Sequence, residues 1–204
     1  MSTLYNALWK KSKVLVRLSL AFETGLPKPS GPVAVLHPEV GFDIAGLTEA
    51  LIVQPFFPTN RTWGNQGFAC DVSLPTRRFS LAIVCCTRSK QQTADLIAQA
   101  AAQADIVVVD GQKTDGIDSH YRSLRKLTTV HGTITKAHGR LFWFAGMNLA
   151  TLRAADQNFD GFVTKPGVFS AGAVDSASAL LAGALPEHLS GDIADLGAGW
   201  GYLS

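Results

Sequence analysis

The chain has 204 residues, of which 47% are hydrophobic and 17% charged, with 18 basic and 16 acidic side chains. This composition predicts a soluble protein with a packed core and excludes disorder, collagen and a coiled coil. A chain of this length buries about 70% of the surface that its unfolded form exposes, so it needs no disulfide or metal for stability.

The cysteines and the apolar runs indicate the cellular compartment of the protein. Cys70, Cys85 and Cys86 form no C-x-x-C pair and have no histidine at ligand spacing. We therefore predict free thiols, no metal site and a cytoplasmic protein. The apolar stretch from Val14 to Phe22 is interrupted by a charged residue and is shorter than a membrane span, so no transmembrane segment is expected. The lysines before it leave no apolar region of signal-peptide length.

The first half of the chain predicts alternating strands and helices. A helix is expected over Thr3 to Lys13, followed by a proline-rich loop. Ser89 to Ala104 has apolar residues at helical spacing, with Ser89 as its N-cap. Short apolar runs rich in β-branched residues are typical of parallel strands buried on both faces. Four such runs occur: Val33–Leu36, Leu51–Val53, Leu81–Cys85 and Ile106–Val109.

The segment Asp110–Gly116 follows the last of these runs and precedes a predicted helix from Asp118 to Lys126. Open α/β sheets bind ligands at the carboxyl ends of their strands, so this glycine-containing turn is one candidate site. Its lysine lies inside the turn and not after the second glycine, so it is not a phosphate-binding P-loop. A tight turn that uses glycine for its backbone angles is the other interpretation.

The second half of the chain predicts a hairpin and then a new α/β region. Thr128–Thr135 and Arg140–Phe144 read as antiparallel strands, and the first domain is expected to end near them. The sequence therefore predicts an α/β doubly wound sheet with a terminal hairpin over residues 1–150, followed by the beginning of a second α/β domain over 151–204. The second region is predicted to contain a strand at Phe159–Thr164, a helix at Val174–Ala184 and a strand at Asp192–Leu196.

Charge is distributed unevenly along the chain. Residues 113–140 carry six basic and two acidic side chains, whereas residues 145–204 carry two and six. Such asymmetry favours a face that contacts a polyanion, although a solvated helix and hairpin would give the same counts. The candidate RNA-binding residues, six for phosphates and one aromatic residue for base stacking, are Lys113, Arg122, Arg125, Lys126, Lys136, Arg140 and Tyr121.

The segment Asp192–Tyr202 carries the most informative motif, D-x-G-x-G-x-G. Asp195 precedes Gly197, Gly199 and Gly201. Glycines let a backbone pass close to a ligand, and a carboxylate at a strand end can accept hydrogen bonds from an ammonium group. Tyr202 stands where the dinucleotide fingerprint requires glycine, which argues against a nicotinamide-dependent oxidoreductase. The motif resembles the first motif of class I S-adenosylmethionine-dependent methyltransferases.

A second motif lies upstream, where Lys165–Ser170 reads K-P-G-V-F-S and Asp175 and a leucine-containing helix follow. The combination resembles the two-domain methyltransferases that modify a guanine amino group in small-subunit ribosomal RNA. The resemblance implies a Rossmann-like methyltransferase fold, with an amino-terminal domain that has lost the cofactor motif. It also implies that Phe169 and Ser170 lie beside S-adenosylmethionine, and that Asp175 orients the helix or reaches the site.

The chain departs from that family in two respects. No N-P-P-[FY] catalytic motif occurs, and the acidic residue that would hold the cofactor ribose is missing. The sequence thus corresponds to the amino-terminal domain and the opening of the catalytic domain. We expect methyl transfer to a guanine exocyclic amino group as the function of the complete enzyme, with this chain an incomplete form. The alternative is a non-catalytic RNA-binding or assembly module. Continuation of the gene past Ser204 into N-P-P-[FY] would favour the enzyme.

Overall fold

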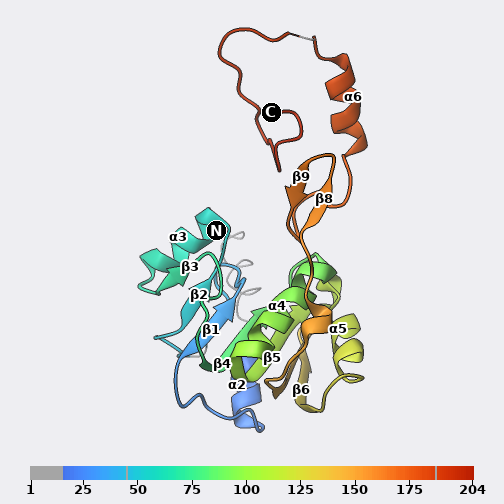
Figure 1. Ribbon diagram of the computed structural model, residues 1–204. Helices are drawn as coiled ribbons and strands as arrows, with labels where there is room; N and C mark the ends of the chain where they lie inside the picture. Colours follow the sequence, from blue (N-terminus) through green and yellow to red (C-terminus); the bar gives the residue numbers. More distant parts are fainter. Residues whose placement is uncertain (1–15, 45, 187) are drawn as a thin grey trace. The chain divides into compact units, whose positions relative to one another are not determined.

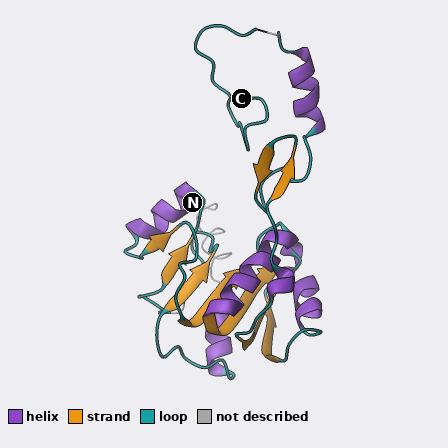
Figure 2. Cartoon of the chain, viewed as in Figure 1, coloured by secondary structure: helices purple, strands orange, loops and turns teal. Residues whose placement is uncertain are grey.

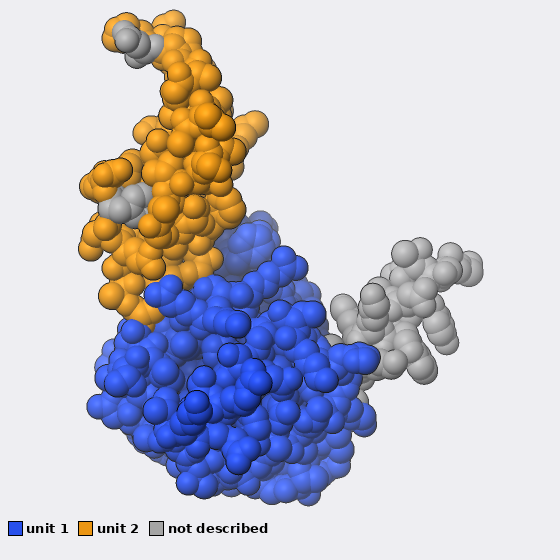
Figure 3. Space-filling view, turned by 90° about the vertical axis from the view of Figure 1, so that its right-hand side faces the viewer, with its two compact units in different colours: residues 1–153 blue, residues 154–204 orange. Residues whose placement is uncertain are grey.

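A computed structural model describes residues 16–44, 46–186 and 188–204 (Figure 1). The chain divides into two compact units, residues 1–153 and 154–204, which are coloured separately in Figure 3. The helix expected over Thr3 to Lys13 lies outside the described residues.

Unit 1 contains a seven-stranded sheet with the order β3-β2-β1-β4-β5-β7-β6. Strands β1 to β5 are parallel where they pair, and β7 runs antiparallel to both of its neighbours. Chain connections leave β1 and β4 in opposite directions, so these neighbours form the topological switch point of the sheet. The strands are β1 Val33–Leu36, β2 Leu51–Val53, β3 Cys70–Asp71, β4 Phe79–Cys85, β5 Ala104–Gln112, β6 Val130–Lys136 and β7 Gly139–Ala145.

Both faces of this sheet are covered, which explains the continuous apolar strands. Alternate strand residues point to opposite faces, and each face has its own buried cluster. One cluster includes Leu96 and Ile97 of α4 and Leu124 of α5, and the other includes Leu18 of α2 and Trp63 of α3. Figure 2 shows these helices flanking the sheet. The α-helices of unit 1 are α2 Val16–Glu23, α3 Phe57–Asn65, α4 Lys90–Gln103 and α5 Ile117–Leu124.

Several local expectations are confirmed. The first two predicted strands coincide with β1 and β2, and the predicted hairpin is β6–β7. Ser89 is the N-cap of α4, and its side chain accepts a hydrogen bond from the Gln92 amide at 3.2 Å. The doubly wound α/β class follows from the parallel strands and the helices on both faces.

The interpretation of Asp110–Gly116 as a turn throughout is wrong. Strand β5 continues to Gln112, because its pairing with β7 extends to Gly139. A short 3-10 helix, η1 (Lys113–Asp115), makes the turn, and Gly116 has a positive φ of 78° before α5. The glycine therefore serves the backbone angle of the turn, as the second interpretation proposed.

The described residues of unit 2 form a two-stranded hairpin, β8 (Gln157–Phe159) and β9 (Phe162–Thr164), and one helix, α6 (Ser176–Ala184). The single strand expected at Phe159–Thr164 is therefore wrong, because Asp160 and Gly161 have positive φ angles and reverse the chain. The strand expected at Asp192–Leu196 is also wrong: residues 192–195 have no regular secondary structure, Leu196 begins a turn, and the segment is exposed. A buried parallel strand needs paired neighbours, and no neighbouring strand pairs with this segment in the described part of unit 2.

Candidate cofactor and RNA sites

The glycine motif in unit 2 forms an open backbone loop. Gly197, Gly199 and Gly201 have φ angles of 88°, 63° and 88°, which side-chain-bearing residues rarely adopt. A Cβ at Gly197 or Gly201 would meet no atom within 4 Å. Asp195 accepts a hydrogen bond from the Ser204 hydroxyl at 2.9 Å and is exposed. The glycines thus adopt backbone angles that favour glycine, but Asp195 does not lie at the end of a strand here.

The two sequence motifs of unit 2 meet through Trp200. Its indole Nε1 donates a hydrogen bond to the Phe169 carbonyl oxygen at 3.1 Å, across 31 positions of sequence. Its ring packs against Phe162 and Tyr202, with centroid distances of 4.9 Å and 5.7 Å. Trp200 therefore ties the glycine loop to the P-G-V-F-S segment and to β9. The motif comparison assigned this residue no role, although an aromatic residue between two glycines was the visible signal.

Three predicted cofactor residues of unit 2 have local contacts. The Phe169 side chain is 75% exposed, so it is not a core aromatic here. The Ser170 hydroxyl donates to the Ala173 carbonyl oxygen at 2.7 Å and stabilises a turn. Asp175 is the N-cap of α6, where its carboxylate accepts from the Ser178 amide at 3.0 Å. Asp175 thus caps the helix. Contact of these residues with a cofactor stays a prediction.

In unit 1, the turn after β1 is closed by the protein's own side chains. His37 has a positive φ of 54°, and Pro38 behind it is buried. The Pro38 carbonyl oxygen accepts from Gln54 Nε2 at 3.2 Å and from Trp63 Nε1 at 3.3 Å. Gln54 directly follows β2, where ligands of open α/β sheets approach. These contacts join the turn after β1 to the end of β2 and to α3, and the sequence analysis did not identify Gln54 or Trp63.

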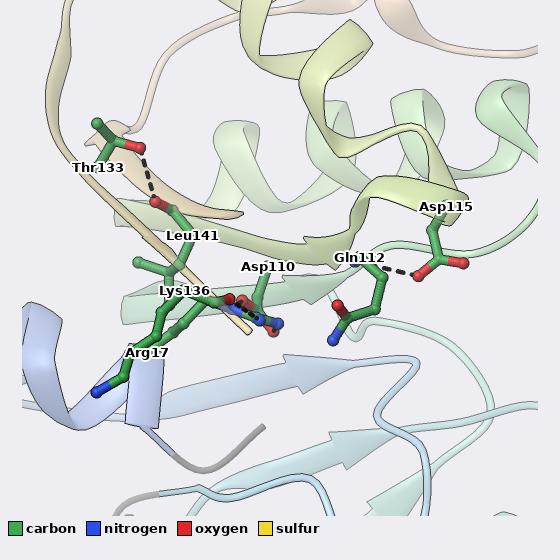
Figure 4. A network of polar contacts seen from close by, with 7 residues as sticks. All are labelled: Arg17, Asp110, Gln112, Asp115, Thr133, Lys136 and Leu141. Atoms are coloured by element: carbon green, nitrogen blue, oxygen red, sulfur yellow. Dashed lines mark hydrogen bonds and ion pairs between the residues drawn. The ribbon is translucent and has the colours of Figure 1, made fainter. Parts of the chain in front are cut away.

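A buried ion pair lies further along the sheet of unit 1 (Figure 4). Arg17 of α2 donates to both carboxylate oxygens of Asp110 at 2.6 Å and 3.0 Å and to the Lys136 carbonyl oxygen at 2.9 Å. Burial raises the pKa of Asp110, and the Arg17 guanidinium opposes that rise. A Cβ at Gly139 would lie 2.4 Å from Arg17 Nη1, so glycine is required there. The pair links α2, β5 and the β6–β7 hairpin.

The predicted RNA-binding residues fall into two groups. Arg122, Arg125 and Lys126 line one surface pocket on α5, together with Ser119 and Ser123. Lys113 lies in η1, and its amide donates to the His138 carbonyl oxygen at 3.0 Å, so this turn lies beside the β6–β7 turn. Lys136 ends β6 and is exposed.

Arg140 and Tyr121 already contact each other. The Arg140 guanidinium carbon lies 4.2 Å from the Tyr121 ring centroid, and its Nε donates to Asp118 at 2.7 Å. Arg125 lies 5.6 Å from the same ring centroid. A base could stack on Tyr121 only where these guanidinium groups leave the ring accessible. Base stacking on Tyr121 therefore stays a prediction, and Arg140 is the most neutralised cation of the set.

The described residues contain no group of three potential metal ligands among His, Cys, Asp and Glu. All three cysteines are free, and burial raises the pKa of the Cys86 thiol to about 12. A protonated thiol is a poor nucleophile, so this raised pKa does not point to Cys86 as a reactive cysteine. Within the described ranges, no helix is both long and apolar enough to cross a membrane.

The strand order, the reversed β7 and the helices on both faces define the Rossmann-like methyltransferase fold. Residues 160–204 match the family described as the methyltransferase small domain. This match contains the P-G-V-F-S segment and the glycine motif. The resemblance seen in the sequence is thus confirmed for the fold and for this segment. No curated protein matches the chain.

Two solved structures illustrate the likeness of the fold. The first is the 16S rRNA N2 G1207 methyltransferase RsmC of T. thermophilus, in complex with AdoMet and guanosine. It is 22% identical, with a TM-score of 0.59 over 78% of this chain and 49% of that chain. The second, assigned as a methyltransferase of Pseudomonas syringae, is 11% identical, with a TM-score of 0.51 over 69% of this chain and 99% of that chain. The chain spans about half the length of the RsmC structure.

Proposed function

We propose that this chain is part of a cytoplasmic S-adenosylmethionine-dependent methyltransferase that modifies a guanine exocyclic amino group of small-subunit ribosomal RNA. The observation that carries the proposal is the hydrogen bond from Trp200 to the Phe169 carbonyl oxygen, because it joins the two cofactor motifs of unit 2. The likeness of the fold to an enzyme crystallised with AdoMet and guanosine supports the same substrate class.

The residues of unit 2 fit one wall of a cofactor site. Asp195 would accept hydrogen bonds from the ammonium group of the cofactor, and the backbone at Gly197 and Gly199 would leave room for its methionine portion. When bound, S-adenosylmethionine supplies the methyl group. The described residues supply no paired strand beside Asp195, so they form only one wall of such a site.

We propose different roles for the two units. The domain from residue 1 to 150 is an amino-terminal methyltransferase-like domain without a cofactor site, and the region from 151 to 204 opens the catalytic domain. The closed turn at Pro38 supports the first assignment. The basic residues of α5 support contact of the amino-terminal domain with RNA phosphates.

A second candidate function is a non-catalytic RNA-binding or assembly module. The open glycine loop favours it for this chain alone, because Asp195 and the three glycines face no second strand end among the described residues. In this case unit 1 would supply the RNA affinity.

A methyl-transfer assay separates the two functions. Small-subunit RNA is incubated with labelled S-adenosylmethionine and either this chain or a chain extended beyond Ser204 along its gene. Label on the guanine amino group with the extended chain is the expected result. The module is the better description if the extended chain binds RNA and transfers no label.

A further inference from the structure

Unit 1 exposes a patch of apolar side chains at one corner of its sheet. Four large apolar residues are exposed just after three strands: Val40 after β1, Phe56 and Phe57 after β2, and Val72 after β3. Because these strands are parallel neighbours, the four residues, called here the corner patch, share the carboxyl edge of the sheet. Figure 1 shows β2, β3 and α3 together at this side of unit 1. A cluster of exposed apolar residues indicates a contact surface, whereas single ones are common.

Hydrogen bonds hold the two phenylalanines of the corner patch in place. The Phe56 amide donates to Gln54 Oε1 at 3.1 Å. Asn60 Nδ2 donates to the Gln54 carbonyl oxygen at 2.9 Å and to the Asp71 carbonyl oxygen at 3.3 Å, which joins the ends of β2 and β3. Phe56 is the N-cap of α3 and Phe57 is its first residue, yet they are 63% and 69% exposed. Covering these side chains therefore requires little ordering of the backbone that carries them.

The charge around the corner patch is negative. The segments that surround it, residues 37–44, 54–65 and 70–73, contain three carboxylates and one arginine. These residues are Glu39, Asp43, Asp71 and Arg61. Glu39 is exposed and directly precedes Val40, and Asp71 directly precedes Val72. Complementary charge favours a partner that combines apolar side chains with positive charge, and it disfavours a polyanion.

The amino-terminal segment of the same chain, residues 1–15, has this composition. It lies outside the described residues, and its sequence contains three lysines and no acidic residue. In the helix that the sequence predicts over Thr3 to Lys13, the large apolar residues are two pairs with a spacing of four positions, and they therefore share one face. They are Leu4 with Leu8 and Tyr5 with Trp9. A helix of this length is marginal by itself in water, so its apolar face needs a partner.

The segment is attached at the same edge of the sheet as the corner patch. Arg17, in the first turn of α2, donates to the Lys136 carbonyl oxygen at the end of β6. This point lies at the carboxyl end of β5, because Gln112 pairs with Gly139. Helices α2 and α3 contribute to the same buried cluster and thus cover the same face.

The segment is long enough to reach the corner patch. Helix α2 packs against β6 and β7, and β2 is four strands from β7 in the sheet. Four strand spacings amount to about 19 Å. Fifteen residues span about 22 Å as a helix and about 50 Å when extended.

We propose that residues 1–15 dock on the corner patch of their own chain. The apolar face of the segment packs against Phe56, Phe57 and Val72, and its lysines lie near Glu39. Open α/β sheets bind their ligands at the carboxyl edge, so the docked segment covers the part of that edge formed by β1, β2 and β3. This inference does not depend on the proposed function.

The first experiment measures amide hydrogen exchange by mass spectrometry in the full chain. Exchange over Thr3 to Lys13 should be at least about tenfold slower than in a synthetic peptide of residues 1–15, because docking protects the helix. The double variant Phe56→Ser/Phe57→Ser should restore the rate of the peptide, and serine at the N-cap position maintains α3. Leu127→Ser, which removes an exposed apolar side chain outside the patch, is the control and should leave the protection unchanged. Exchange at the peptide rate in the parent chain, or equal protection in the double variant, overturns the proposal.

The second experiment is a cycle of variants followed by thermal unfolding. Leu8→Ser/Trp9→Ser in the segment and Phe56→Ser/Phe57→Ser in the patch should each lower the melting temperature by about 2–4 °C, the shift expected for about 1 kcal/mol in a chain of this size. If the two sets are in contact, the chain with all four substitutions should lose no more than either double variant. Losses that add in full show that the sets are independent and overturn the proposal.

Two other occupants of the corner patch would give different results. Sedimentation equilibrium detects a second copy of the chain: a dimer that Phe56→Ser/Phe57→Ser dissociates, with residues 1–15 unprotected, overturns docking of the segment. Loss of affinity for a ribosomal RNA hairpin in the same variant, with unchanged protection of residues 1–15, assigns the patch to RNA and also overturns it. None of these measurements needs S-adenosylmethionine, so they are independent of methyl transfer.

Discussion

The turn after β1 in unit 1 and the glycine loop in unit 2 differ in how much space surrounds the backbone. In unit 1, Gln54 and Trp63 donate hydrogen bonds to Pro38 and close the turn. In unit 2, Gly197 and Gly201 leave open space around the backbone. A turn thus becomes packed where neighbouring side chains donate to its carbonyl oxygen, and it stays open where glycines place no side chain beside the backbone.

The largest expected effect concerns cofactor binding by the open loop. This chain should show no micromolar affinity for S-adenosylmethionine in calorimetric titration, and a chain extended beyond Ser204 should bind it. Gly199→Asp in the extended chain should weaken binding at least about 100-fold, or about 2.8 kcal/mol, because bulk and negative charge enter the backbone approach. Gly183→Asp on α6, where a Cβ meets nothing within 4 Å, is the control. Micromolar binding of S-adenosylmethionine by the unextended chain contradicts this prediction.

The stability of unit 1 should depend strongly on its buried ion pair between Arg17 and Asp110. Arg17→Ala leaves the Asp110 carboxylate buried without its partner, and should lower the free energy of unfolding by about 3–5 kcal/mol. Arg78→Gln removes an exposed pair with Asp105 and should cost no more than about 1 kcal/mol. Urea denaturation followed by circular dichroism measures both. Equal losses for the two variants would show that burial of the Arg17 pair has no special weight.

The basic face of unit 1 should contribute to RNA affinity mainly through charge. Neutralising Arg122, Arg125 and Lys126 together should lower the slope of log affinity against log salt by roughly three, if each contacts one phosphate. Anisotropy titrations of a small-subunit RNA hairpin at several salt concentrations give the slope, with circular dichroism as the check on folding. An unchanged slope in a folded variant means that these three basic side chains are solvated and do not contact RNA phosphates.

The smallest expected effect is a pH dependence of stability that arises from His37 in the turn after β1. Burial lowers the pKa of His37, so the unfolded chain binds more protons than the folded one below the ordinary histidine pKa. Stability should therefore fall as the pH drops from 7 to 5, by at most about 1.4 kcal/mol per pH unit for this group. His37→Asn keeps a residue that tolerates positive φ and should reduce the slope. His120, whose pKa is also lowered, accounts for part of what remains.

Sequence patterns located the elements of unit 1 because their causes are local. The runs Val33–Leu36 and Leu51–Val53 are buried on both faces, so composition alone marked them as strands. The insertion of β7 between β5 and β6 was not predictable in this way, because it depends on pairing across the sheet. The strand expected at Asp192–Leu196 failed for the same reason, since apolar composition cannot supply a partner strand.

The candidate site residues, too, were predictable where the signal is local and unpredictable where it depends on contacts distant in sequence. The D-x-G-x-G-x-G spacing predicted a strand that turns on its glycines; the glycines have positive φ angles, whereas the strand before them is absent. The role of Trp200 as a link to Phe169 depends on a contact between segments 31 positions apart. The pairing of Arg17 with Asp110 spans 93 positions, and no local pattern reveals it.

The long sequence separation between Arg17 and its partners also affects the order in which unit 1 folds as the chain is synthesised. Arg17 finds its carboxylate 93 residues later and its carbonyl partner 119 residues later. At a translation rate of about 5–20 residues per second, roughly 6–24 s separate the synthesis of Arg17 from that of Lys136. The guanidinium must stay hydrated for that interval, and α2 can dock only when the β6–β7 hairpin has left the ribosome. The first helix that the structure describes is therefore among the last elements of unit 1 to reach its final place.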